Sequence, residues 1–359
     1  MQWKLSEEQD AYRDALRGWL GDAAAPERVR EWLDADDGRG DPSTFEKRFG
    51  AEGMAGVGIA EELGGQGGGL VELALTAEEL ARASAPSAAW LATVLAVPAL
   101  ESRPDLVQAA LGGATAVWLL QAGAIPGTGS ALAIGAGGTV SGELPRVLAA
   151  DRASVFVAVV DGTSGREVRL IDAETEGVAV RPRRLLDRTR SVADVRLEGA
   201  QSVALEVDAD SCLTRVTDLA GVLVAADSLG TTQRMLDLAV DYSLQRKQFG
   251  VPIGSFQAVK HAAASILVDL EAGRSGLYYA AASVEARDPE CSLHAAAVKA
   301  QVTAAGARAA DTALTMHGAI GYTWEHDLHL FYKRARLDEH LFGTPSAWNE
   351  RLAERLALV

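Results

Sequence analysis

Proline placement divides this sequence into an interrupted first half and a C-terminal part with long proline-free intervals. Of the 11 prolines, eight lie at or before Pro182, and the remaining three are Pro252, Pro289 and Pro345. Proline removes a backbone donor and clashes with the preceding helical turn, so each proline-free interval can hold one long helix. Apolar residues recur at helical spacing along the first of these intervals. A glycine-containing break divides the last interval into two helices. We therefore predict a four-helix bundle, with helices over residues 210–248, 255–287, 292–316 and 322–341.

The N-terminal part has shorter helical patterns, which clusters of glycine and proline separate. These patterns cover residues 5–20, 24–33, 45–52, 70–82 and 88–100. Between them, residues 61–69 read EELGGQGGG, but no strand pattern precedes this glycine run and no Lys-Ser or Lys-Thr pair follows it. A phosphate-binding loop needs both features, so we predict a turn between helices.

The middle of the chain has the pattern of strands. Residues 114–205 contain β-branched runs, such as Val-Phe-Val-Ala-Val-Val at 155–160, which glycine and Asp-Gly turns separate. The sequence thus predicts an α+β fold. Its parts are an N-terminal α-helical domain at residues 1–113, a small middle β domain at 114–207 and a C-terminal four-helix bundle at 208–359.

Composition narrows the function classes. The 359 residues include 49 Asp and Glu against 34 Lys and Arg, a formal net charge of −15. Such an acidic protein repels phosphate backbones, which argues against a nucleic-acid partner. No stretch reaches the ~18 uncharged apolar residues of a membrane span. The first 20 residues lack the apolar core of a signal peptide. We expect a soluble, cytoplasmic protein without a membrane partner.

Metal and serine-nucleophile chemistry have little support in the sequence. Cys212 and Cys291 show neither metal-ligand nor disulfide-framework spacing. His326 and His329 are three residues apart, but no Glu-x-x-His frame and no cysteine accompanies them. No Gly-x-Ser-x-Gly elbow follows a predicted strand. We predict no metal site and no Ser-His-Asp triad.

Residues 243–261, SLQRKQFGVPIGSFQAVKH, form the most specific pattern. A predicted helix ends here in a cationic pair, a glycine and a proline interrupt it, and a new helix starts. Arg246 can form a forked, charge-assisted pair with a diphosphate, while Phe249 offers a ring and Gln257 an amide to a nucleotide. The alternative is a plain helix corner at which Phe249 belongs to the core and Arg246 is solvated.

This segment strongly resembles the acyl-CoA dehydrogenase superfamily, together with three others: MHGAIGYTWEHDLHLFYKRA at 316–335, LSEEQ at 5–9 and EELGGQG at 61–67. The resemblance is good at both ends of the chain and poor in the middle. It implies the same three-domain order, FAD as cofactor, and α,β-dehydrogenation of an acyl-CoA thioester. In that reaction a glutamate removes the α proton while the β hydride passes to the flavin. An electron-transfer flavoprotein or a similar acceptor is implied as a partner.

The glutamate of the family is missing from both of its positions. The commoner position lies in a Tyr-Glu-Gly-Thr string, which matches residues 341–344. Phe342 stands at the position of the glutamate. The second precedes an arginine early in the first bundle helix and matches Thr214 before Arg215. We therefore assign no catalytic residue. Three acids nearby are interpreted as solvated or helix-end charges: Asp210, Asp218 and Glu339.

The middle domain also departs from the family pattern. Residues 118–159 contain neither the Thr-Glu-Pro-x-Ala-Gly-Ser-Asp loop nor the Trp-Ile-Thr strand that hold the flavin ring in family members. In the family's Gln-x-x-Gly-Gly motif, Thr315 and Ala319 replace the glutamine and the second glycine, while His317 and Gly318 fit.

The resemblance implies a shared cofactor site. In the family dimer, the middle domain of one subunit holds the flavin ring, while the diphosphate and adenine reach the bundle of the neighbour. This chain retains the donated part, as in the smaller subunits of α2β2 acyl-CoA dehydrogenases that act on steroid side-chain CoA thioesters. A catalytic acyl-CoA dehydrogenase subunit is the implied partner. Two alternatives remain: a homo-oligomeric dehydrogenase with a displaced carboxylate, and a non-catalytic scaffold that retained the fold.

Eleven residues are implied to bind cofactor or substrate. For FAD these are Arg246, Gln248, Phe249, Phe256, Gln257, His317, Gly318, Ala319, Gly343 and Thr344. For the acyl-CoA substrate, the resemblance implies Arg215.

Overall fold

The computed structural model describes residues 5–38, 41–127, 132–162 and 165–356, and the chain divides into two compact units. The bundle unit comprises residues 1–29, 74–85 and 221–359, and the sheet unit comprises residues 30–73 and 86–220. Helices, then a β-sheet, then helices follow one another along the chain, which confirms the predicted fold class. The domain limits at 113 and 207 stay predictions; they fall between the last N-terminal helix and β1 and between β8 and α7.

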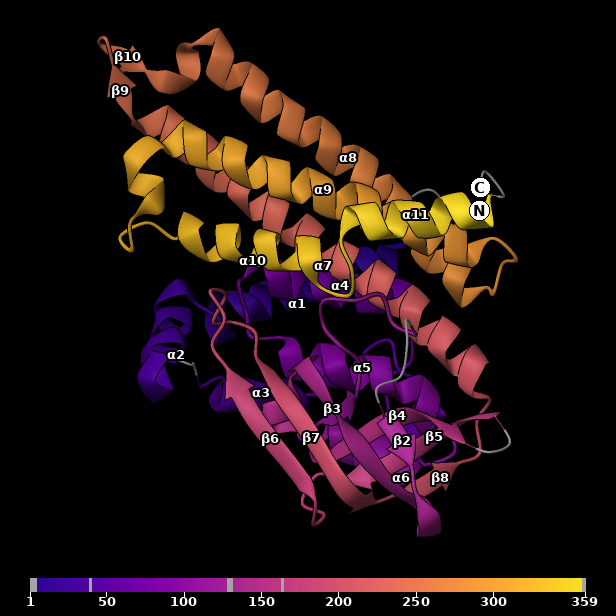
Figure 1. Ribbon diagram of the computed structural model, residues 1–359. Helices are drawn as coiled ribbons and strands as arrows, with labels where there is room; N and C mark the ends of the chain where they lie inside the picture. The colour runs from indigo at the N-terminus through magenta and orange to yellow at the C-terminus, as the bar shows by residue number, and fades with distance from the viewer. Residues whose placement is uncertain (1–4, 39–40, 128–131, 163–164, 357–359) are drawn as a thin grey trace. The chain divides into compact units, whose positions relative to one another are not determined.

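Long helices form the bundle unit (Figure 1). α7 (Ala209–Gln245) belongs to it from residue 221 onward, and it is followed by α8 (Gln257–Glu285) and α9 (Cys291–His317). α9 packs against α8, and α10 (Leu328–His340) and α11 (Pro345–Arg355) pack on α9. Many of the buried residues of α9 are alanines, whose small side chains let these neighbours approach closely. The predicted helices correspond to α7–α10, whereas the sequence did not predict α11.

Two N-terminal helices complete the bundle unit. α1 (Glu7–Ala23) begins with a capping box in which Ser6 and Gln9 bond each other's backbone amides. α4 (Leu70–Arg82) lies beside it, because the Tyr12 hydroxyl is 2.7 Å from Thr76 Oγ1 and Arg17 donates to Glu79 at 2.9 Å.

A glycine sets the closest approach between α4 and α7. An added Cβ at Gly230 would lie 1.9 Å from the carbonyl oxygen of Glu78. We expect Gly230→Ala to lower the free energy of unfolding by about 2–3 kcal/mol, because the helices must move apart. Chemical denaturation measures this effect. The control is Gly276→Ala in α8, where the nearest atom is 3.9 Å away. Equal stability of the two variants would refute the close approach.

A fully buried ion pair lies at the centre of the bundle unit. Arg334 of α10 donates to both carboxylate oxygens of Asp227 on α7, from Nε and from Nη2, each at 2.7 Å. Its Nη1 donates to the carbonyl of Ala85 at 2.8 Å. One guanidinium therefore ties two helices to the segment that follows α4.

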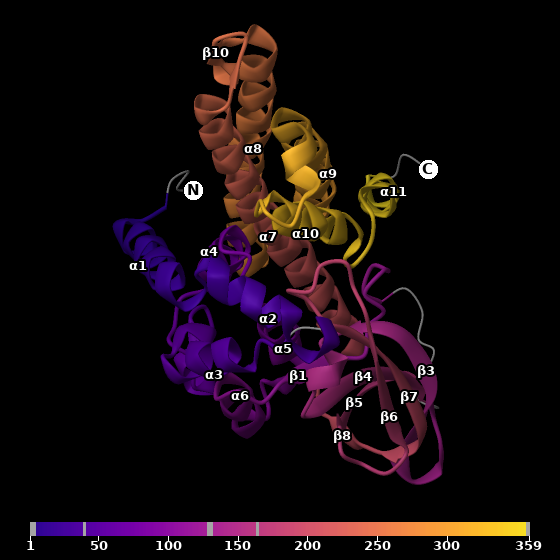
Figure 2. The same ribbon diagram turned by 90° about the vertical axis from the view of Figure 1, so that its left-hand side faces the viewer.

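The sheet unit is built on a curved sheet (Figure 2). Among the described residues, the sheet has eight strands, and the path β6-β7-β3-β2-β4-β5-β8 joins seven of them. β1 pairs with β4 in parallel, as does β2, and the other pairs in this sheet are antiparallel. The strands are β1 (Ala116–Trp118), β2 (Leu132–Ile134), β3 (Thr139–Leu148), β4 (Val155–Gly162), β5 (Gly165–Asp172), β6 (Val178–Arg183), β7 (Val192–Gln201) and β8 (Val203–Leu205).

Helices accompany this sheet. α5 (Ala88–Leu100) packs on β1, and Trp118 Nε1 donates to the carbonyl of Leu95 at 2.8 Å. The unit also contains α3 (Ser43–Ala51), α6 (Pro104–Leu111) and the part of α2 (Pro26–Gly38) from residue 30. Residues 61–69 form a 3₁₀ turn at Glu61–Leu63 followed by loop, and this result confirms the predicted turn. In the part of the chain that the structure describes, every helix is too short or too polar to cross a membrane.

Candidate functional site

The segment at 246–257 forms an exposed corner between α7 and α8 (Figure 1). The two-residue strands β9 (Lys247–Gln248) and β10 (Val251–Pro252) pair as a hairpin after the end of α7. The amide of Ile253 donates to the carbonyl of Arg246 at 2.8 Å and closes the hairpin. Phe249 adopts φ +53° and Gly250 φ +82° at the turn, a left-handed pair typical of tight hairpins.

The side chains of this corner point to solvent. Arg246, Gln248 and Gln257 are exposed, and Phe249 is 93% exposed. The Phe249 and Phe256 rings meet edge to face at 6.2 Å between centroids. The structure therefore brings the predicted cofactor residues of this segment together. It also disagrees with the alternative in which Phe249 belongs to the core.

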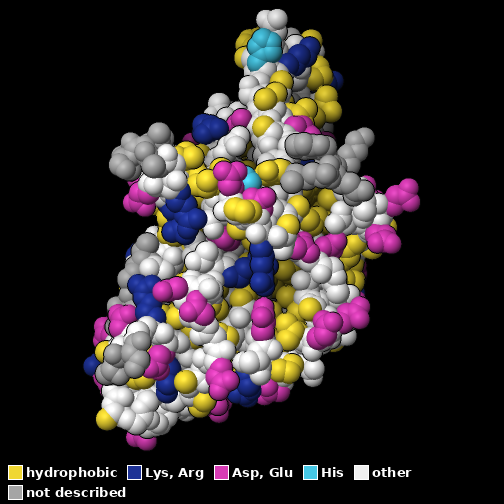
Figure 3. Space-filling model, turned by 90° about the vertical axis from the view of Figure 1, so that its right-hand side faces the viewer, with side chains coloured by type: hydrophobic (Ala, Val, Ile, Leu, Met, Phe, Trp, Pro, Cys, Tyr) yellow, Lys and Arg dark blue, Asp and Glu magenta, His cyan; other side chains and the backbone are white. Residues whose placement is uncertain are grey.

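The start of α8 suits an anionic group. Phe256 precedes the helix and makes no side-chain hydrogen bond to its first turn, so that turn has no side-chain cap. Amides of an uncapped helix start bind phosphate oxygens, and a nearby arginine adds a forked donor. Arg246, the amide side chain of Gln257 and an exposed ring thus fit the diphosphate and nucleotide portion of FAD. In Figure 3, hydrophobic and cationic side chains gather at the upper end of the bundle.

The end of α9 lies next to α7. The ring of Tyr242 stacks on His317, with 4.9 Å between centroids, and His326 meets His317 at 4.5 Å. His317 is buried, and burial lowers its pKa. Gly318 and Ala319 are exposed, and a Cβ at Gly318 would meet no atom within 4 Å. The backbone of residues 318–319 is thus open to a ligand, while the ring of His317 packs inside; a contact of His317 with FAD stays a prediction.

The loop at 341–344 is held from two sides. Phe342 is 2% exposed, and its carbonyl accepts a hydrogen bond from Trp348 Nε1 at 2.9 Å. Lys299 Nζ donates to the carbonyls of Gly343, at 3.1 Å, and Asp338, at 3.0 Å. Thr344 Oγ1 caps α11 by accepting from the amide of Ala347. Gly343 and Thr344 therefore shape this loop, and their contacts with the cofactor stay predictions.

Sequence reasoning missed Lys299 and Trp348 as supports of this loop. The available signal was a lone lysine inside an apolar, alanine-rich helix, because a buried ammonium must find acceptors. That signal identifies a buried polar contact but not its partners, which lie 39 and 44 residues further along the chain.

Lys299 makes stability depend on pH. Burial lowers its pKa to about 7, although Asp338 and Glu339 oppose that shift. Above pH 7 the unfolded chain still binds a proton at this lysine, up to its ordinary pKa near ~10.4, while the folded chain does not. We therefore expect the free energy of unfolding to rise between pH 7 and about 8.5, by at most ~1.4 kcal/mol per pH unit from this group.

Lys299→Met should remove this slope in urea denaturation at several pH values. Lys260→Met, at an exposed lysine, should keep the wild-type slope. If Lys299→Met kept the same slope as the wild type, the titration would belong to other groups.

Arg215 lies on the part of α7 that belongs to the sheet unit. Its side chain is half-buried, and the preceding Thr214 is exposed. Its assignment to the substrate stays a prediction. The structure places no carboxylate at 214 or 342, and among the described residues no group of three His, Cys, Asp or Glu could hold a metal ion.

Residues 118–159 stand where the family has its flavin-ring loop, and the start of this segment bonds to β3. The amide of Ala122 donates to the carbonyl of Arg146 at 2.8 Å, and the amide of Arg146 donates to Asp194 at 3.1 Å. Residues 128–131 of this segment lie outside the described residues. In the described part, Arg146 lies on β3 and its backbone makes both of these hydrogen bonds.

Sequence similarity to known proteins assigns this chain to a family. Residues 6–102 match the N-terminal domain of acyl-CoA dehydrogenases, and residues 214–357 match their C-terminal domain. The acyl-CoA dehydrogenase IpdE2 of Mycobacterium tuberculosis (strain ATCC 25618 / H37Rv) is 33% identical over 348 residues, which cover 96% of each protein. FadE34 of the same strain is also 33% identical, but the chain spans only 48% of its length. The chain belongs to the acyl-CoA dehydrogenase family, whose members are flavin oxidoreductases and typically depend on FAD.

Solved structures share the whole fold. The ChsE4-ChsE5 complex from Mycobacterium tuberculosis matches with a TM-score of 0.88 and 25% identity, over 100% of both chains. A variant of the Tcur3481-Tcur3483 steroid ACAD matches with a TM-score of 0.89 and 24% identity, over 98% of both chains. The structural neighbours therefore include complexes of acyl-CoA dehydrogenase chains.

Proposed function

We propose that this chain is the base-lacking subunit of a heteromeric, FAD-dependent acyl-CoA dehydrogenase. A partner subunit supplies the catalytic glutamate and the contacts to the flavin ring. One observation carries the proposal: the chain presents an exposed cofactor-type corner at residues 246–257, while Phe342 is buried where the family has its base. The chain thus has the means to bind part of a cofactor but not to start the reaction.

Removal of the α proton needs a positioned base. Neither the phenyl ring of Phe342 nor the hydroxyl of Thr214 accepts a proton at neutral pH. Two of the nearby acids already have cationic partners: Asp210 bonds Arg166 at 3.0 Å and Glu339 bonds Arg336 at 3.2 Å. These pairs weaken the alternative of a displaced carboxylate for Asp210 and Glu339. Asp218 is buried within α7, so its interpretation as a solvated or helix-end charge was wrong.

The bundle unit offers a surface for the partner. Phe249, Tyr322 and Trp324 are large, exposed side chains on segments at the ends of α7 and α9. Exposed aromatic side chains are enriched at protein interfaces, where they bury large areas at low entropic cost. A partner that docks here would cover Phe249 and bring its own cofactor half-site to Arg246.

In the complex, each group has a defined task. FAD, when bound, supplies the acceptor for the β hydride of the substrate. Arg246 and the uncapped start of α8 would bind the diphosphate of FAD, and the Phe249 ring would shield its nucleotide portion from water. Lys299 and Trp348 fix the loop at 341–344 against the bundle.

The substrate of the proposed complex is a steroid whose side chain is joined to CoA as a thioester. Support comes from the similar Tcur3481-Tcur3483 structure, which is described as a steroid ACAD. An electron-transfer flavoprotein or a similar protein is the proposed acceptor for the electrons of the reduced flavin.

Co-expression with an acyl-CoA dehydrogenase homologue that keeps the glutamate tests this function. The co-purified pair should be yellow and should oxidise an acyl-CoA, whereas either chain alone should be inactive. Replacing the partner's glutamate by glutamine should abolish turnover while flavin is retained. Activity of this chain alone would favour a homo-oligomeric enzyme. Equal activity of the partner without this chain would favour a non-catalytic scaffold.

A further inference from the structure

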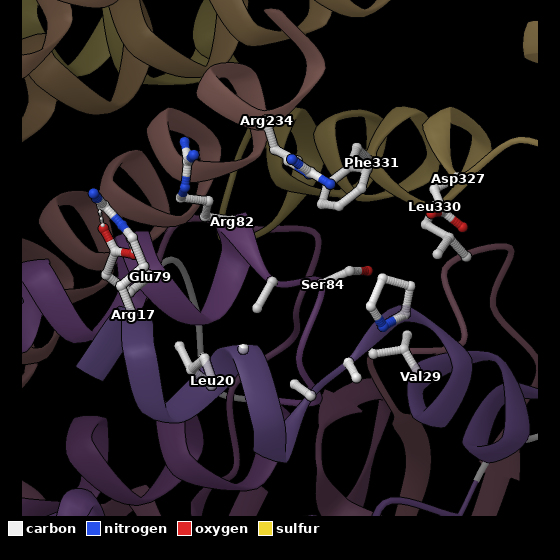
Figure 4. Close-up of a pocket in the computed structure, with 15 residues that line it drawn as sticks. Arg17, Leu20, Val29, Glu79, Arg82, Ser84, Arg234, Asp327, Leu330 and Phe331 are labelled. Carbon is white, nitrogen blue, oxygen red and sulfur yellow. Dashed lines mark hydrogen bonds and ion pairs between the residues drawn. The ribbon is translucent and has the colours of Figure 1, made fainter. Parts of the chain in front are cut away.

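The bundle unit contains a cavity of about 170 Å³ between α1, the start of α2, the end of α4, α7 and α10 (Figure 4). A water molecule occupies about 30 Å³ in the liquid, so the cavity holds roughly six groups of that size. Its apolar lining includes Leu20, Val29 and Phe331. Arg234 lies 11 residues before the end of α7 at Gln245, about 16 Å along the helix axis, so the cavity is separate from the cofactor corner that follows α7.

Three arginines line this cavity, and two of them are neutralised. Arg17 donates to Glu79 at 2.9 Å, and Arg82 forms an ion pair with Asp237 at 2.8 Å. Arg234 has no carboxylate within ion-pair distance among the described residues. In the part of the lining that the structure describes, its guanidinium is thus the cation that makes no such pair, and Asp327 adds a carboxylate to the same lining. Figure 4 shows its side chain extending from α7 into the cavity.

A buried hydroxyl faces the same space. Ser84 is 1% exposed, and its Oγ has no hydrogen-bond partner among the described residues. A buried hydroxyl without a partner is unfavourable, so Ser84 Oγ offers a donor to a ligand. The residue also adopts φ +53°, a left-handed conformation that is unusual for serine.

The remaining acids restrict what can bind. Glu79 is paired with Arg17, but Asp327 also lines the cavity, so its carboxylate would repel a dianion such as phosphate more strongly than a monoanion. A monoanion can pair with Arg234 and accept from Ser84 while its apolar part contacts Val29 and Phe331. A carboxylate with a chain of about four carbons has about six non-hydrogen atoms, which matches the volume.

We propose that this cavity is a binding site for a short-chain aliphatic carboxylate. The carboxylate group pairs with the Arg234 guanidinium and accepts a hydrogen bond from Ser84 Oγ. The hydrocarbon chain lies against the apolar wall formed by α1, α2 and α10. The site is distinct from the proposed cofactor corner, so it stands or fails independently of the heteromeric function.

Calorimetric titration of the full chain with sodium butyrate tests the site. We expect saturable binding at concentrations up to about 50 mM. Inorganic phosphate and n-butanol should bind at least about tenfold more weakly, because one lacks the apolar chain and the other the charge. Arg234→Gln should weaken butyrate binding about tenfold, and Ser84→Ala less. Arg308→Gln, which changes an exposed arginine of α9, should bind like the wild type.

A second pair of variants tests the cavity without removing a charge. A Cβ added at Gly21 or at Gly18 of α1 meets no atom within 4 Å, but only Gly21 lines the cavity. Gly21→Leu should fill the space and abolish binding, whereas Gly18→Leu should leave it unchanged. The proposal is overturned if the wild type does not bind butyrate, if Arg234→Gln or Gly21→Leu binds it as tightly, or if phosphate binds equally well.

Discussion

Replacing Arg246 by glutamine is expected to strip FAD from the complex of this chain with a base-carrying partner. The guanidinium is exposed at the corner next to the uncapped start of α8, where it can bond two phosphate oxygens. A hydrogen bond to a charged group contributes about 1.5–3 kcal/mol, so the dissociation constant of FAD should rise roughly 10- to 100-fold. Flavin absorbance per chain after gel filtration measures the loss.

The neighbouring lysine supplies the control for this variant. Lys247 is the next residue and is also exposed, but its ammonium lacks the forked donors with which a guanidinium bonds two phosphate oxygens. Lys247→Gln should therefore keep most of the flavin. Unchanged FAD content in Arg246→Gln, or an equal loss in both variants, would contradict the assignment of Arg246 to the cofactor.

The second large effect concerns the buried pair of Arg334 and Asp227. Asp227→Asn is expected to lower the free energy of unfolding by about 3–5 kcal/mol, because it leaves a guanidinium charge buried without its counter-charge. Two hydrogen bonds of 2.7 Å join the groups, and both side chains are buried. Urea denaturation followed by circular dichroism measures this change.

An exposed ion pair on the same helix provides the matched comparison. Arg336 of α10 pairs with Asp311 of α9, and more than half of the Asp311 side chain is exposed. Asp311→Asn should cost less than ~1 kcal/mol, since exposed ion pairs contribute little. If Asp227→Asn were no more destabilising than Asp311→Asn, the buried pair would not hold α7 and α10 together.

The sequence predicted the long helices well because residues near each helix end determine where the helix stops. Proline and glycine end each helix at a definite place, so the predicted 255–287 and 292–316 lie close to the observed α8 and α9. Two short helices were missed: α6 has eight residues and α11 eleven. Isolated helices of that length are marginal in water and depend on tertiary packing, as α11 does on α9.

In the candidate site, too, the sequence predicted local features and missed contacts between distant residues. The corner at 246–257 is contiguous in sequence, so the pattern predicted its residues. It left open whether Phe249 lies in the core, and the structure shows that this side chain is exposed. The absence of the base could be predicted, because the sequence has Phe342 at the position of the family's glutamate. The support of its loop could not be predicted, because Lys299 bonds one carbonyl of α10 and one of the loop itself, and every residue has a backbone carbonyl, so the sequence does not show which ones accept. The parallel pairing of β1 and β2 with β4 likewise depends on contacts between distant strands.

The FAD content of the purified chain, alone and in complex, tests the central claim most directly. The account predicts that the chain purified alone is colourless and inactive on acyl-CoA, and that the co-purified complex is yellow, active and contains both subunits in equal number. Stoichiometric FAD and dehydrogenation of an acyl-CoA by the purified chain alone would contradict it.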